Sequence, residues 1–344
     1  MKFSISKNQL FLSFFIIQTG SVFISFQAPL INEAGRDAWI IFAVICVIQL
    51  FQLFLYEKFH SYFKLPRFLQ WMYSAYWILL IASFLAYIQK SLSVWAFPLT
   101  PSYVIIGTIV ALSFYANMSR PESVINLGVL LIPLIPLIFI FVTLAIPELV
   151  WTNLFPMGNI SKEEWFGGTK ESIHAFIGAE IYLFYRGFVV KSDKIKLRFI
   201  LIYQVVLSSF YLITILFSLL SFSIDELKII PEPLVYLLKS QEVTFIERLD
   251  LFFIFIWMAW SIITVIYLVF TVTLFMEINT PKKLTSKKII LHLLLFILPL
   301  IIIAKDYHQL AQDMLIYGHL LFALIIPFFV IVYNKWRSKN VEKV

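Results

Sequence analysis

The chain has 344 residues, of which 61% are hydrophobic and 14% are charged, and its formal net charge is +7. A mean hydropathy of +0.90 excludes a soluble domain with a polar surface. The composition therefore predicts an all-α polytopic membrane protein, with residues 1–344 forming one integral membrane domain.

Apolar runs of about 17 to 25 residues are long enough to cross a bilayer as helices. We expect ten membrane-spanning helices, at residues 8–30, 38–56, 68–89, 102–117, 124–146, 171–190, 197–222, 251–276, 289–304 and 314–333. The first run is too long for the core of a signal peptide, so we expect it to remain as the first helix.

The basic residues predict the orientation, because Lys and Arg accumulate in cytoplasmic loops. With ten spans both termini lie on one side, and that side carries 19 of the 27 basic residues. We therefore expect cytoplasmic termini, a cytoplasmic tail at 334–344, and external loops at 147–170 and 223–250. The positive charge then indicates contact with anionic membrane lipids and no nucleic-acid partner.

The two external loops are longer than a minimal turn and are either lids or solvated connectors. In the second loop, Pro233 could open a short amphipathic helix on the membrane surface. Cys46 is the single cysteine, so no disulfide forms within one chain. His174, His292 and His319 lie on three separate predicted helices without a shared face, so we expect no metal site and no cofactor.

The first predicted helix carries polar residues at mid-depth: Gln18, Thr19, Gly20 and Ser21. One interpretation is a break in the helix at a ligand site, because Gly20 leaves helical geometry easily and its neighbours supply donors and acceptors. The other is a continuous helix in which the small residues allow close packing against a neighbour.

The sixth predicted helix places Gly178 and Glu180 near mid-depth. An ionisable group there costs at least about 2.5 kcal/mol, so it usually faces a cavity or a partner, although a structural hydrogen bond is the alternative. Helices one and six occupy equivalent positions if ten helices divide into two inverted repeats, at 8–146 and 171–333. This predicts two discontinuous helices around a transporter-type binding centre.

Several stretches resemble the B subunits of bacterial spore germinant receptors, in the amino acid permease superfamily. They are "ISKNQLFLSFFIIQTGSVFI" in the first helix, "EAGRDAWI" at 33–40, "NLFP" at 153–156, "FIGAE" at 176–180 and "ERLDLFFIFIW" at 247–257. The resemblance covers most of the chain and lies in the order and spacing of these stretches.

The resemblance implies a leucine-transporter-like fold, with five-plus-five inverted repeats and a central site between helices one, three, six and eight. It implies the inner membrane of the bacterial spore and a complex with an A subunit and a lipoprotein C subunit. The implied ligand-binding residues are Gln18, Thr19, Gly20, Ser21, Tyr76, Ser83, Tyr87, Phe176, Gly178, Glu180, Trp260, Ser261 and Thr264. One position departs from many amino acid permeases, which carry a second glycine where this chain has Val22, so backbone capture of a carboxylate is not expected there.

Three hypotheses for function follow. The first is a nutrient-sensing receptor subunit that binds a small germinant, such as an amino acid, and triggers germination with its partner subunits. The second is a secondary transporter, or a conduit for ions or water, with Glu180 as a proton-linked switch. The third is an intramembrane enzyme, which we do not expect because the chain lacks clustered nucleophiles and bases.

Overall fold

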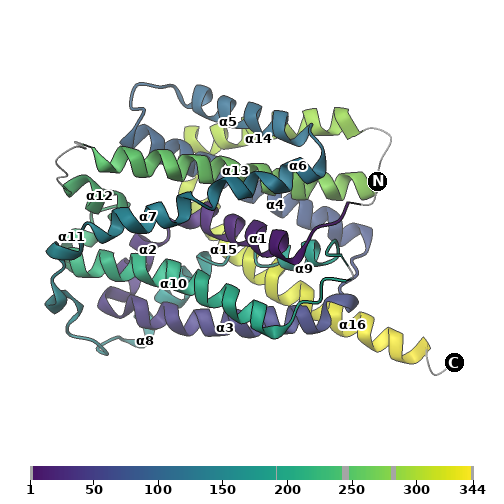
Figure 1. Cartoon of the computed structure of the whole chain (residues 1–344), viewed down its shortest axis with the longest axis horizontal. Coiled ribbons are helices and arrows are strands. Elements are labelled where there is room, and N and C mark those ends of the chain that lie inside the picture. The colour runs from purple at the N-terminus through teal and green to yellow at the C-terminus, as the bar shows by residue number, and fades with distance from the viewer. Residues whose placement is uncertain (1–2, 191, 242–247, 280–283, 342–344) are drawn as a thin grey trace.

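The computed structural model describes residues 3–190, 192–241, 248–279 and 284–341, and these residues are mostly helical. The long helices lie side by side along the long axis of the molecule (Figure 1). Their bounds are α1 Lys7–Val22, α2 Gln27–Ala34, α3 Ala38–Phe59, α4 Arg67–Trp95, α5 Ser102–Asn117, α6 Pro121–Asn126, α7 Leu134–Thr143, α8 Lys162–His174, α9 Ile181–Arg186, α10 Leu197–Ser221, α11 Ile224–Leu227, α12 Pro233–Ser240, α13 Leu249–Asn279, α14 Leu284–Ala304, α15 His308–His319 and α16 Ile326–Val341.

Seven helical stretches in the described ranges are long and apolar enough to cross a membrane: Gln27–Tyr62, Arg67–Trp95, Pro121–Glu148, Leu197–Ser221, Leu249–Met276, Thr285–Ala304 and His308–Asn340. The predicted fourth span, Ser102–Asn117, is a shorter apolar helix. The predicted first and sixth spans are each divided into two helices, α1 with α2 and α8 with α9. The all-helical class is confirmed, whereas the number of ten spans stays a prediction.

The first interruption does not lie where the polar residues predicted it. Helix α1 continues to Val22, and the chain leaves the helix over residues 23–26. The hydroxyls of Thr19 and Ser21 donate to carbonyls of their own helix, at 2.6 Å to Phe15 and 3.0 Å to Ile17. The hydrogen bonds of these two hydroxyl groups therefore lie within α1, and the helix is not interrupted at these residues.

The second interruption lies between α8 and α9, at residues 175–180. Gly178 has a φ of 92°, a left-handed conformation that glycine adopts without steric cost. Helix α8 begins with a capping box, in which the Ser161 side chain and the Glu164 side chain each bind the other residue's backbone N–H. The sequence thus sets both the start of α8 and the turn that follows it.

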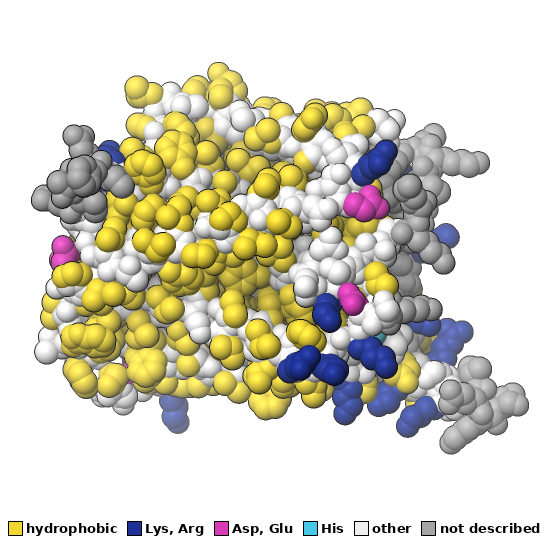
Figure 2. Space-filling view, in the orientation of Figure 1, with side chains coloured by type: hydrophobic (Ala, Val, Ile, Leu, Met, Phe, Trp, Pro, Cys, Tyr) yellow, Lys and Arg dark blue, Asp and Glu magenta, His cyan; other side chains and the backbone are white. Residues whose placement is uncertain are grey.

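The two ends of the molecule differ in charge. Both chain termini lie at one end, which we call the terminal end, and the Lys and Arg side chains visible in Figure 2 gather there. The short helices α11 and α12 lie at the opposite end, which we call the loop end (Figure 1).

Helix α12 begins at Pro233, as the sequence predicts, and it has one buried and one exposed face. Its apolar residues are buried, including Leu234 and Leu238 at 0% exposure, and they pack against α10 and α13, whereas Tyr236, Lys239 and Ser240 are exposed. The contact of this helix with the membrane surface stays a prediction. Residues 242–247 of the predicted loop lie outside the described ranges.

Candidate functional site

A cavity of about 310 Å³ lies between the two interrupted helices. Ser21 lines it from the end of α1, and His174 lines it from the end of α8. Ser83 and Tyr87 of α4 form another wall, and Glu232 lines it at the start of α12. The cavity therefore extends from the loop-end helix α12 to both helix interruptions.

Glu232 anchors the loop-end side of the cavity. Its carboxylate accepts hydrogen bonds from Tyr87, at 2.8 Å, and from Ser91 and Trp95, all of which lie on α4. The residue is 5% exposed, so three donors replace the water that the carboxylate loses. Lys90 and His308 also line this part of the cavity.

The inner wall of the cavity holds polar atoms without partners. The Nδ1 of His174 and the Oγ of Ser83 are buried and make no hydrogen bond with the described residues. Buried polar atoms are normally paired with protein or water. Two of the residues that line the cavity therefore carry unused hydrogen-bonding groups.

Gln18 joins the two interrupted helices outside the cavity wall. Its Nε2 donates to the Phe176 carbonyl at 3.2 Å, and its Oε1 accepts from the Tyr203 hydroxyl at 2.5 Å. Tyr211 donates to the Gln18 carbonyl at 2.9 Å. The amide group is thus fully engaged in tying α1 to the turn after α8 and to α10.

Gly20 lies where α1 packs closely against α13. A Cβ atom built there would lie 1.9 Å from the Thr264 Oγ1 and 2.8 Å from the Trp260 Cδ1. Thr264 in turn donates to the Ile16 carbonyl at 3.0 Å. Close packing is therefore the interpretation of Gly20 that the structure favours. On the same face of α13, the Ser261 Oγ and the Trp260 Nε1 are buried without a described partner.

Glu180 lies at the end of the turn that precedes α9. Its residue exposure is 0%, and its Oε1 accepts a hydrogen bond of 2.8 Å from the Trp77 Nε1 of α4. Its Oε2 has no hydrogen-bond partner in the part of the chain that the structure describes. The Tyr76 hydroxyl, one residue along α4 from Trp77, is buried and equally unpaired among those residues.

A π-helical turn, Leu320–Ile325, joins α15 to α16 and frees carbonyl groups inside the bundle. Tyr73 donates to the Phe322 carbonyl at 2.7 Å, and Gln52 donates to the Ala323 carbonyl at 2.9 Å. Tyr56 also donates to the Ala323 carbonyl. Side chains of α3 and α4 therefore donate hydrogen bonds to backbone carbonyl groups of the π-helical turn.

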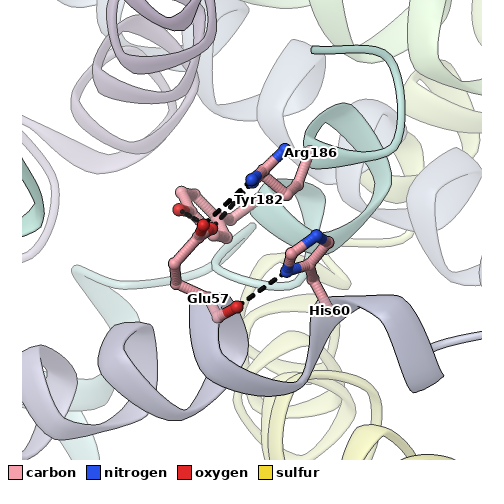
Figure 3. Close-up of polar contacts among 4 residues, drawn as sticks. All are labelled: Glu57, His60, Tyr182 and Arg186. Carbon is pink, nitrogen blue, oxygen red and sulfur yellow. Dashed lines mark hydrogen bonds and ion pairs between the residues drawn. The ribbon is translucent and has the colours of Figure 1, made fainter. Parts of the chain in front are cut away.

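Glu57, near the end of α3, and Arg186, the last residue of α9, form an ion pair (Figure 3). The Arg186 Nε and Nη2 donate to the two Glu57 oxygens at 2.8 and 3.0 Å, and the Tyr182 hydroxyl donates to Oε2 at 2.9 Å. Ile5 pairs with the segment after α9, with its N–H 3.0 Å from the Phe188 carbonyl. The ends of α1 and α9 are thus held together and to α3.

The structure divides the predicted ligand residues into two groups. Ser21, Ser83 and Tyr87 line the cavity. Those that do not line it are all buried: Gln18, Thr19, Gly20, Tyr76, Phe176, Gly178, Glu180, Trp260, Ser261 and Thr264. Sequence reasoning missed Lys90, His174, Glu232 and His308, because a lone charged or imidazole side chain carries no motif.

Comparison with known proteins agrees with this architecture. A family model described as "Spore germination protein" matches residues 4–314. Spore germination protein KB of Bacillus subtilis (strain 168) is 25% identical over 371 residues, covering 99% of this chain and 97% of the relative. Spore germination protein GerQB of Bacillus cereus is 23% identical over 273 residues, or 75% of each chain.

Spore germination protein YndE of Bacillus subtilis (strain 168) is 24% identical over 255 residues, covering 70% of this chain and 67% of the relative. The family match spans nearly the whole described bundle, from the start of α1 into α15. The chain therefore belongs to the spore germination protein family of permease-type membrane proteins.

Proposed function

We propose that this chain is the nutrient-sensing membrane subunit of a spore germinant receptor. It binds a small germinant between the two interrupted helices and triggers germination with an A subunit and a lipoprotein C subunit. The observation that carries the proposal is the cavity of about 310 Å³, which reaches both helix interruptions and is lined by residues with unpaired polar atoms, Ser83 and His174.

The proposal includes a ten-helix, five-plus-five inverted repeat. Its support is that α1 with α2 and α8 with α9, the interrupted pairs, are the first members of the two predicted repeats. The proposal also places both termini in the cytoplasm of the spore's inner membrane, since basic side chains gather at the terminal end (Figure 2). The cavity then lies on the outer side of the ion pair between Glu57 and Arg186.

Signalling follows from a shift between two conformations. A germinant that occupies the cavity stabilises the arrangement of α1 and α8 that fits it best, and the shift is limited by its differential affinity for the two arrangements. Thr19, Gly20 and Glu180 belong to this centre as residues that become accessible, or change partners, in the other arrangement.

The test is the thermal stability of the purified protein with amino acids, nucleosides and sugars. A nutrient at about 100 times its dissociation constant adds about 2.7 kcal/mol of stability. Ser83→Phe, which fills the cavity, should abolish the shift, whereas Ser119→Phe, at an exposed position after α5, should keep it. A shift that survives Ser83→Phe contradicts the cavity as the site.

Germination of spores carrying Glu180→Gln or Thr19→Val tests the buried part of the centre. Both variants should weaken the response to nutrients. An unchanged response in both would remove these residues from the site and leave the cavity wall alone.

The second candidate is a secondary transporter or a conduit for ions or water. It is favoured by the buried Glu180, whose unpaired Oε2 provides a site for a proton or cation during transport. Uptake of radiolabelled amino acids into sealed proteoliposomes distinguishes the two functions, because a sensor binds without net flux.

A further inference from the structure

Two buried imidazoles lie on helices that pack against each other beside the cavity. His174 is the last residue of α8, lines the cavity and is 7% exposed. His319 is the last residue of α15, which packs against α8, and it is 2% exposed and does not line the cavity. The Nδ1 atoms of both rings are buried without a hydrogen-bond partner among the described residues.

An imidazole has two nitrogen atoms, and a buried one normally finds a partner for each that is not exposed to water. No ion pair joins either ring to an acidic side chain of the described residues. His174 therefore has a buried nitrogen for which the described residues supply no partner, and the residue lines an empty volume large enough for a small molecule.

The remaining charges of the cavity favour the same kind of ligand. Glu232 is the one acidic residue among the described residues that line the cavity, and three donors already bind it. Lys90 lines the cavity from an exposed position and forms no ion pair with the described residues. The charged group on the cavity wall that has no described partner is thus the Lys90 ammonium group.

Three backbone N–H groups at the interruption of the first helix are already hydrogen-bonded. The backbone N–H groups of Phe23, Ser25 and Phe26 donate to the carbonyls of Thr19 and Val22, at 3.0 to 3.2 Å. These amides are already used, so a carboxylate group would gain little from approaching them. His174, in contrast, lines the cavity and has an Nδ1 without such a partner among the described residues.

We propose that His174 binds the carboxylate of the nutrient, and that Lys90 attracts this anion as it enters the cavity. The inference rests on the proposed function, because it requires a nutrient in this cavity. The ligand class is then small carboxylates, amino acids included, rather than uncharged sugars or nucleosides.

The experiment compares each of the 20 standard L-amino acids with its α-carboxamide, together with inosine and D-glucose, by thermal shift of the purified full chain. The wild type should be stabilised by at least one acid and respond at least tenfold more weakly to its amide. His174→Gln should lose this tenfold discrimination. His292→Gln, at a buried histidine that does not line the cavity, should retain it.

The possible failures are distinguishable. Equal responses to acid and amide, or stabilisation by inosine or D-glucose alone, would overturn the carboxylate inference and leave the nutrient site in place. A wild-type preference that persists in His174→Gln would overturn the role of His174. No response to any compound would overturn the proposed function and this inference together. If His174→Gln fails to fold, the wild-type comparison of acid with amide still tests the carboxylate preference, and His174→Asn tests the role of His174.

Discussion

The Trp77 Nε1 and the Glu180 Oε1 are joined by a hydrogen bond of 2.8 Å between two fully buried side chains, one on α4 and the other at the interruption before α9. This hydrogen bond therefore connects the turn between α8 and α9 to the continuous helix α4. The described residues provide no second donor to the other carboxylate oxygen. The stability of this turn should depend on the indole N–H.

Replacing Trp77 by Phe removes this donor and keeps an aromatic ring. Leaving a buried acceptor without a partner should cost about 1 to 3 kcal/mol and lower the melting temperature. Trp257→Phe is the matched control, because Trp257 is also buried but its Nε1 has no described partner. Equal melting temperatures for the two variants would show that the Trp77 hydrogen bond contributes nothing.

Arg186→Gln should destabilise the terminal end. The variant leaves the Glu57 carboxylate, whose side chain is 11% exposed, with Tyr182 as its remaining described donor. Loss of one partner in a buried ion pair costs on the order of 3 kcal/mol, and the second substitution Glu57→Gln should recover part of it. Lys228→Gln breaks an exposed pair with Asp225 and should leave the melting temperature unchanged. If the stability loss of the double variant equals the sum of the losses in Arg186→Gln and Glu57→Gln, the two residues are not energetically coupled.

Gly20→Ala should destabilise the contact between α1 and α13. The added methyl group would lie 1.9 Å from the Thr264 Oγ1, and overpacking of this kind costs about 1 to 3 kcal/mol or more. Thr264→Ala in the same chain removes that oxygen and should restore part of the stability. Gly187→Ala, where the nearest atom is 3.4 Å away, is the control in a calorimetric comparison. A fully stable Gly20→Ala would mean that the two helices separate at little cost.

Glu232→Ala should release α12 from α4. Tyr87, Ser91 and Trp95 would lose their common acceptor, so amides of α12 should exchange with deuterium faster than in the wild type. Glu226→Ala removes an exposed carboxylate from the start of α11 and should leave the exchange of α12 as it is. Unchanged exchange in Glu232→Ala would show that apolar packing alone holds α12.

Local patterns predicted much of this fold, because they act over a few residues. Pro233 sets the start of α12, and the Ser161 and Glu164 pair sets the start of α8. The position of the first interruption was not predictable in this way. Thr19 and Ser21 look like residues of a broken helix, yet their hydroxyls bind carbonyls one turn back, and whether they do so depends on what packs around them.

The cavity was only partly predictable for the same reason. Ser83 and Tyr87 are among the residues that the family resemblance implies, but Glu232 reads as one of several acids in a polar loop until α12 folds against α10 and α13. His174 reads as an isolated histidine until α15 packs against α8. Burial of a charged group is decided by contacts between distant segments, which no local pattern contains.

The π-helical turn between α15 and α16 has a consequence for how a signal could reach the C-terminal segment. Converting it to an α-helix would remove one residue from the wide turn and rotate α16 by about 100° relative to α15. Tyr73 and Gln52 bind the carbonyls of the wide form, so they hold α16 in its present rotation. Because His319 immediately precedes this turn, a displacement of α15 at the cavity becomes a change in which face α16 presents at the terminal end.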